Sequence, residues 1–169
     1  MISTVEKVLF LKSIDLFSQI PGEDLSQIAQ ITDEVQYEEG DEVFHEGDPG
    51  DSLYLVIEGR VRVHRGGAEV AVLGERQVFG EMALLDSEPR SASVLAMTDL
   101  TLLKIARDDF TEILAEKAEI AQGIIKVLTR RLRNTLSLKD ADDDPARPGS
   151  REGVPPLGDE AGGSASPRR

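Results

Sequence analysis

Short apolar segments separated by glycines fill the middle of the chain, from about Val35 to Ile105. Across Gly59, apolar and charged side chains alternate with the period of two that marks a strand with one buried face. One parity holds Leu53, Leu55, Ile57, Val61 and Val63, and the other holds Glu58, Arg60, Arg62 and His64. Glycines stand where turns are needed, at positions 40, 47, 59, 66, 67 and 74. This pattern predicts a rolled antiparallel sheet of short strands.

Helical patterns flank the strands on both sides. Ser3 and Glu6 have the spacing of a capping box and predict a first short helix. Leu25, Ile28 and Ala29 recur at helical spacing and predict a second one. The chain therefore begins with two short helices ahead of the sheet.

A longer helical region is predicted after the last strand. Asp109 and Glu112 have the spacing of a capping box and place its start there, with a joint near residues 116–119. Apolar residues four apart form one stripe: Ile120, Ile124, Leu128, Leu132 and Leu136. That stripe can pack on the chain's own barrel or against a second copy. The fold class is thus α+β, an antiparallel, jelly-roll-like β-roll with N-terminal helices, a short helix near residues 82–85 and a long C-terminal helix.

Composition limits the partners of this chain. A net charge of −13 argues against binding to a nucleic-acid backbone, which needs concentrated positive charge. No apolar run reaches the roughly 18 residues of a membrane span, and no secretory signal is present, so a cytoplasmic location is expected. Residues 1–139 are long enough for one domain with a core. Residues 140–169 hold most of the prolines and are predicted to be a disordered tail.

Residues 79–93 carry the chemistry of a small-ligand site. A phosphodiester anion is bound by backbone N–H groups at a helix start and by a guanidinium that can reach two oxygens. Gly80 lets the backbone approach a ligand, residues 82–85 are long enough for about one helical turn with free amides, and Arg90 supplies the cation. Glu81 can accept a hydrogen bond from a ribose hydroxyl. Together these residues predict a site for a nucleotide with a singly charged phosphate.

The same stretch resembles the phosphate-binding cassette of the cyclic nucleotide-binding domain family, which includes catabolite activator proteins, protein kinase A regulatory subunits and cyclic nucleotide-gated channels. The family pattern, Phe-Gly-Glu-(Leu/Met)-Ala-Leu followed by Pro-Arg-x-Ala-(Ser/Thr), is complete here. The resemblance implies that Glu81 accepts from the ribose 2′-hydroxyl and that Arg90 pairs with the cyclic phosphate, helped by Ser91 and the Ala83 amide. The binding residues that it implies in this region are Phe79, Gly80, Glu81, Met82, Ala83, Arg90, Ser91 and Ala92.

The resemblance covers roughly residues 5–138 and includes part of the long helix. Residues 128–135 are similar to the ligand-facing helix of the activator proteins, which implies that Thr135 contacts the adenine edge. On this basis the expected ligand is cyclic AMP in preference to cyclic GMP. The last helix is expected to move on binding and to be available for pairing with a second copy in a homodimer.

Other function classes find less support in the sequence. A cupin-like metalloenzyme needs clustered histidines, but His45 and His64 lie far apart in no paired motif, so no metal is expected. No Ser/His/Asp set or P-loop motif is present, so no enzymatic activity is expected. An activator-type transcription factor carries a helix-turn-helix after the long helix, and this chain is expected to lack one.

The sequence therefore predicts a non-catalytic sensor of cyclic nucleotides that regulates an unknown effector protein. The alternative is an interaction module of the same fold with an empty or low-affinity pocket. Either could be part of, or partner to, a larger transporter, channel or kinase.

Overall fold

The computed structural model describes residues 1–142, with side chains to residue 138. Its strands form two four-stranded sheets. The first has the order β1-β8-β3-β6, with β1 at Thr32–Tyr37, β8 at Leu100–Ala106, β3 at Ser52–Glu58 and β6 at Val78–Phe79. The second has the order β2-β7-β4-β5, with β2 at Glu42–Phe44, β7 at Ser93–Ala96, β4 at Val61–Arg65 and β5 at Ala68–Leu73. Every pair is antiparallel, which confirms the predicted β-roll.

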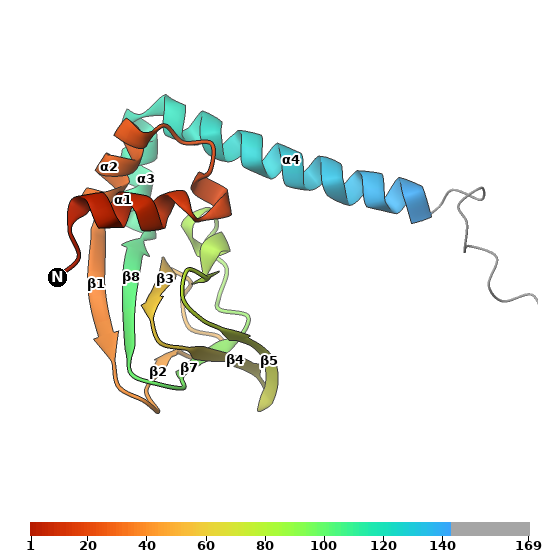
Figure 1. The fold of residues 1–169 in the computed structure, drawn as a ribbon. Helices are drawn as coiled ribbons and strands as arrows, with labels where there is room; N and C mark the ends of the chain where they lie inside the picture. Colours follow the sequence, from red (N-terminus) through yellow and green to blue (C-terminus); the bar gives the residue numbers. More distant parts are fainter. Residues whose placement is uncertain (143–169) are drawn as a thin grey trace, which may run out of the picture. The chain divides into compact units, whose positions relative to one another are not determined.

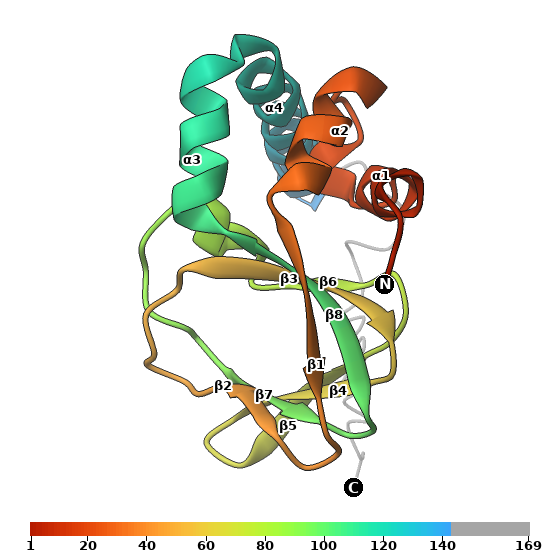
Figure 2. The same cartoon turned by 90° about the vertical axis from the view of Figure 1, so that its left-hand side faces the viewer.

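The helices precede, interrupt and follow the strands. They are α1 (Thr4–Lys12), the 3₁₀ turn η1 (Asp15–Phe17), α2 (Gly22–Gln30), the 3₁₀ turn η2 (Glu81–Leu84), α3 (Arg107–Glu116) and α4 (Ala118–Asp142). Figures 1 and 2 show α1, α2 and α3 gathered at one end of the roll, where β8 leads into α3. By its internal packing the chain divides into a unit of residues 1–130 and a second unit that starts at Arg131.

Both faces of β3 are buried, although the sequence predicted one. Leu53 and Leu55 pack against the helices, whereas Tyr54 and Val56 lie in a second cluster between the two sheets. The first sheet is covered by helices on one face and by the second sheet on the other, so both parities are buried over residues 52–56, and exposure rises only at the end of the strand, where Glu58 is exposed. Val61, predicted to share the side of Leu53, packs instead with Tyr54 and Val56 in the cluster between the sheets.

The predicted start of the first helix is confirmed, and the predicted start of the helix after the last strand is wrong. The Ser3 hydroxyl accepts from the Glu6 N–H at 3.2 Å and the Glu6 carboxylate accepts from the Ser3 N–H at 3.0 Å, as a capping box requires. Helix α3 instead begins at Arg107, ahead of the predicted Asp109, with no side-chain cap. Strand β8 runs straight into α3, and the Arg107 N–H donates to the Asp51 carbonyl at 2.8 Å. The predicted joint near residues 116–119 is confirmed, since α4 starts at Ala118.

The first part of α4 is anchored in the 1–130 unit. Ile120 and Ile124 are buried among the helices, and Gly123 lies so close to the turn after η1 that a Cβ there would be 2.9 Å from the Gln19 carbonyl oxygen. The apolar stripe thus packs on the chain's own core in this part.

Beyond Arg130, Leu132 and Leu136 are 59% and 51% exposed. The helix continues to Asp142, and the rest of the predicted tail lies outside the described residues. Within residues 1–142, no helix combines the length and apolar character that crossing a membrane requires.

Candidate functional site

A cavity of about 380 Å³ lies beside the 79–92 segment. Every predicted binding residue within that segment lines it. The cavity is also lined by residues that the sequence did not single out for binding: Phe44, Gly50, Val63, Val78, Asp86, Glu88, Pro89 and Val94. The structure therefore brings the predicted residues from 79 to 92 together around one space.

Gly80 forms the turn between β6 and η2. Its φ of 74° lies in the left-handed region, which glycine adopts at little cost. A Cβ at this position would meet Arg90 Nη1 at 2.5 Å and the Ser52 carbonyl oxygen at 2.8 Å. Glycine is required here both for the backbone conformation and for the space that the guanidinium occupies.

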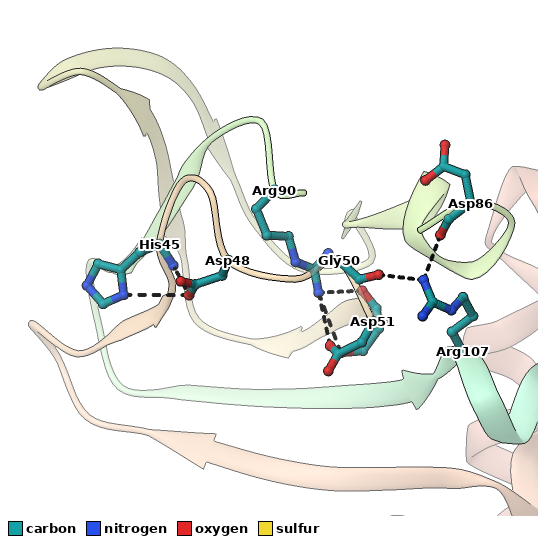
Figure 3. A network of polar contacts seen from close by, with 8 residues as sticks. His45, Asp48, Gly50, Asp51, Asp86, Arg90 and Arg107 are labelled. Carbon is teal, nitrogen blue, oxygen red and sulfur yellow. Dashed lines mark hydrogen bonds and ion pairs between the residues drawn. The ribbon is translucent and has the colours of Figure 1, made fainter. Parts of the chain in front are cut away.

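Arg90 is buried, with 7% of its surface exposed. Its Nη2 donates to the Ser52 carbonyl oxygen at 2.8 Å and lies 3.7 Å from Asp51 Oδ1 (Figure 3). The Arg90 N–H donates to the Asp48 carbonyl at 2.8 Å, and the Arg90 carbonyl accepts from the Gly47 N–H at 2.8 Å. Backbone and side chain are thus both tied to the loop that leads into β3.

The Arg90 guanidinium is buried away from water, and neighbouring polar and charged groups replace only part of its lost hydration. Burial lowers the pKa of Arg90 from its ordinary value, while Tyr54, Asp51 and Asp48 act in the opposite direction. The guanidinium carbon lies 4.1 Å from the centre of the Phe44 ring. Within the described residues, the buried Nε has no hydrogen-bond partner. A cation in this state is suited to an anionic ligand, which would restore part of the lost solvation.

The predicted helical turn is the 3₁₀ turn η2. Met82 is 55% exposed at the cavity, Ala83 is buried, and Glu81 is half-buried. The Ala83 N–H donates to the Gly80 carbonyl at 3.1 Å, so the free amide predicted at Ala83 is engaged within the turn. A 3₁₀ turn closes its hydrogen bonds one residue earlier than an α-helix, which is why this amide is already used.

Ser91 and Ala92 extend the site toward β7. Ser91 is exposed, and its carbonyl accepts from Arg65 Nε at 2.8 Å. Ala92 is buried against the cavity, with 9% of its surface exposed. The Arg65 contact ties the residue after Arg90 to the end of β4.

Arg107, at the start of α3, is a further link that the sequence reasoning missed. Its Nη1 donates to the Gly50 carbonyl at 2.9 Å and to the Asp86 carbonyl at 3.0 Å (Figure 3). Gly50 is buried, and a Cβ there would overlap the Glu88 carbonyl oxygen. One side chain therefore joins α3, the loop before β3 and the segment after η2.

Phe44, Asp51 and Ser52 also support Arg90 and were not predicted. The shorter Ser52 contact uses the backbone carbonyl at 2.8 Å, which any residue could supply, and the Ser52 hydroxyl lies at the longer distance of 3.5 Å from Nη2. Residues 46–51 are rich in Gly and Asp, and that composition could have marked the loop as a partner of a buried arginine.

Thr135 belongs to the second unit and is described there alone. It is exposed, and its hydroxyl donates to the Arg131 carbonyl at 3.0 Å, within the same helix. Its contact with a base stays a prediction.

The two histidines each lie near a carboxylate in different places. His64 Nε2 is 3.1 Å from Glu42 Oε1, and His45 Nδ1 is 3.8 Å from Asp48 Oδ2. Within the described part of the chain, no cluster of three or more histidine, aspartate or glutamate side chains is arranged to hold a metal ion.

The cavity offers three kinds of contact to a ligand. Arg90 offers charge-assisted donors for an anion, Glu81 offers a carboxylate for hydroxyl groups, and Val63, Val78 and Val94 offer an apolar wall. A phosphate, a sugar and a planar base need these three contacts in one place.

Comparisons with known proteins agree with this chemistry. The family model described as "Cyclic nucleotide-binding domain" matches residues 34–117. The "Cyclic AMP receptor protein" of Thermus thermophilus is 37% identical over 128 residues, which is 73% of this chain and 59% of that protein. The "cAMP-dependent protein kinase regulatory subunit" of Aspergillus niger is 36% identical over 113 residues, 66% of this chain and 28% of that protein.

Solved structures share the fold. The crystal structure of the N-terminal domain of a transcriptional regulator from Streptomyces coelicolor A3(2) has a TM-score of 0.72 and 35% identity. The match covers 77% of this chain and 94% of that one. The chain spans less than two thirds of the length of the curated relatives named above. This chain belongs to the cyclic nucleotide-binding domain family.

Proposed function

We propose that this domain is a non-catalytic sensor of cyclic AMP. The observation that carries the proposal is the buried Arg90 guanidinium, which lines a cavity together with Glu81 and has a buried Nε with no hydrogen-bond partner in the described residues. A cyclic phosphodiester carries one negative charge and matches one guanidinium. Relatives whose names include cyclic AMP support the choice of nucleotide.

The proposed roles combine the lining of the cavity with the resemblance of this segment to the family's phosphate-binding cassette. Arg90 pairs with the cyclic phosphate, and Ser91 adds a hydroxyl donor beside it. Glu81 accepts from the ribose 2′-hydroxyl. Phe79, Gly80, Met82, Ala83 and Ala92 shape the wall around these contacts.

The output is proposed to run through α4. Thr135 would contact the adenine edge, because a hydroxyl can both donate and accept. The exposed Leu132 and Leu136 suit packing against a second copy or an effector protein. The support for this step is the resemblance of residues 128–135 to the ligand-facing helix of the activator proteins.

The domain is proposed to act on a protein effector in the cytoplasm and not on DNA. The net charge of −13 opposes contact with a phosphate backbone. Some relatives are named as transcriptional regulators, so binding to DNA has to be tested for this chain. A gel-shift assay with duplex DNA, with and without cyclic AMP, should show no salt-sensitive retention.

Calorimetric titration with cyclic AMP, cyclic GMP and 5′-AMP tests the ligand assignment. We expect saturable binding of cyclic AMP, weaker binding of cyclic GMP, and little binding of 5′-AMP, whose second charge one guanidinium cannot match. Binding of neither cyclic nucleotide would contradict the proposal and favour an interaction module with an empty pocket.

A further inference from the structure

The guanidinium of Arg90 lies over the ring of Phe44. The guanidinium carbon is 4.1 Å from the ring centre, well within the range of a cation–π contact. Phe44 is the last residue of β2, is half-buried and lines the same cavity as Arg90. It belongs to the second sheet, whereas Ser52, which accepts from Arg90 Nη2, begins β3 in the first. The guanidinium is therefore held from both sheets.

Phe44 is itself fixed by two other rings. Its centroid lies 6.0 Å from that of Tyr54 and 5.8 Å from that of Phe79, and the latter two rings stack at 5.1 Å. Tyr54 is on β3 and Phe79 on β6, both in the first sheet. Aromatic contacts of this kind restrict the orientation of each ring. The ring beneath Arg90 is thus part of a rigid cluster between the sheets.

An aromatic ring can stabilise a buried cation that must also bind an anionic ligand. A carboxylate in direct hydrogen bond would neutralise the guanidinium and occupy the in-plane donors that a phosphate needs. Here the nearest carboxylate, Asp51, lies at 3.7 Å and is 67% exposed, so its pairing with Arg90 is weak. The Phe44 ring stabilises the cation without a negative charge that would compete with a phosphate, and among the guanidinium donors Nη2 is engaged by the Ser52 carbonyl.

We propose that Phe44 is a positioning residue for the nucleotide phosphate, acting by holding the Arg90 guanidinium over its ring at the cavity without a negative charge that would compete with the ligand. This inference rests on the proposed function. It differs from that proposal because it assigns a role to a side chain outside the 79–92 segment.

The test compares three variants by calorimetric titration with cyclic AMP. Phe44→Leu keeps apolar bulk but removes the ring face, and should weaken binding by about tenfold. Phe44→Tyr keeps the face and should bind within about twofold of the wild-type chain. Phe110→Leu removes a buried ring that packs on Phe17 away from the cavity, so it should lower the melting temperature without changing affinity.

Phe44→Leu in an Arg90→Gln background separates positioning from direct ligand contact. The neutral amide of glutamine carries no charge for the Phe44 ring to stabilise. Phe44→Leu should then cost less than about twofold. An equal loss in both backgrounds would mean that Phe44 touches the ligand itself, and would overturn the inference.

A ligand-independent readout completes the test. Ring current should shift the Arg90 Nε–H proton resonance upfield in the wild-type chain, and Phe44→Leu should remove that shift while Phe44→Tyr retains it. Wild-type chain that binds neither cyclic AMP nor cyclic GMP would defeat the proposed function, whereas normal binding by Phe44→Leu, or an unshifted resonance, would defeat the role of Phe44.

Discussion

A methyl group on Gly80 would meet Arg90 Nη1 at 2.5 Å, so the guanidinium occupies the space that any other residue at position 80 would need. The two residues are both in the cassette, but their proximity depends on β6 and β3. The Ser52 carbonyl, which accepts from Arg90, would lie 2.8 Å from the same methyl group. The glycine and the arginine therefore form one structural unit.

Gly80→Ala should weaken cyclic AMP binding by more than tenfold, because the new methyl group displaces the guanidinium. It should also lower stability by about 1–2 kcal/mol, since φ at this position is 74°. Titration calorimetry and thermal unfolding measure the two effects. The matched control is Gly67→Ala, whose φ is 83° but whose Cβ would meet nothing within 4 Å. It should lose stability and keep its affinity, and a similar loss of affinity in both variants would contradict this account.

Gly123→Ala tests how closely α4 packs on the turn that follows η1. Alanine favours a helix by about 1 kcal/mol, but its Cβ would lie 2.9 Å from the Gln19 carbonyl oxygen. Overpacking against backbone costs about 1–3 kcal/mol, so we expect a net loss of about 1 kcal/mol in urea unfolding. Gly22→Ala, in α2 with open space around it, should not lower stability. An unchanged or raised stability for Gly123→Ala would show that the helix shifts without cost.

Tyr37 should make the fold sensitive to strongly alkaline pH. Burial, with contributions from Tyr54 and Asp41, raises its pKa from 10.0 to about 12. The fold thus favours the neutral phenol, and this stabilisation is present in full below pH 10 and is lost as pH rises through about 12. In Tyr37→Phe the free energy of unfolding should fall less steeply over that interval. Equal slopes for the two chains would contradict the assignment.

Thr135→Val should reduce the discrimination between cyclic AMP and cyclic GMP while leaving the melting temperature nearly unchanged. The hydroxyl is exposed and bonds only within its own helix among the contacts described, so its removal leaves the core intact. Thr129→Val places the same change at an exposed site six residues earlier in the same helix and should alter neither property. Unchanged selectivity in Thr135→Val, or intact binding in a chain truncated before Thr129, would contradict the proposed role of α4.

The candidate residues that the sequence singled out in the cavity are local in the chain. Gly80, Glu81 and Arg90 fall within one short segment, so their residue types and spacing indicate a site for a phosphate and a sugar hydroxyl without knowledge of the fold. The capping box at Ser3 and Glu6 is local in the same sense and is confirmed. The site residues that were missed approach Arg90 from other strands. Phe44 and Ser52 come from different sheets, and no local pattern links them to a residue about 40 positions away.

Two errors in the fold have physical causes of the same kind. Alternation predicted one buried face for β3, but Tyr54 is buried on the other face because a second sheet covers it. The predicted start of α3 at Asp109 is wrong because β8 continues directly into the helix, and Arg107 is hydrogen-bonded to the loop before β3. In both cases a tertiary neighbour overrides the local pattern.

The most direct test of the central claim compares two arginines by titration with cyclic AMP. Arg90 is 7% exposed at the cavity, whereas Arg62 pairs with Glu69 at 3.0 Å on the surface of the second sheet. Truncating one partner of a buried charge pair costs about 2–5 kcal/mol, so Arg90→Ala should weaken binding by at least tenfold. Arg62→Ala should bind like the wild-type chain. Equal affinities for the two variants would contradict the assignment of Arg90 as the phosphate-binding residue.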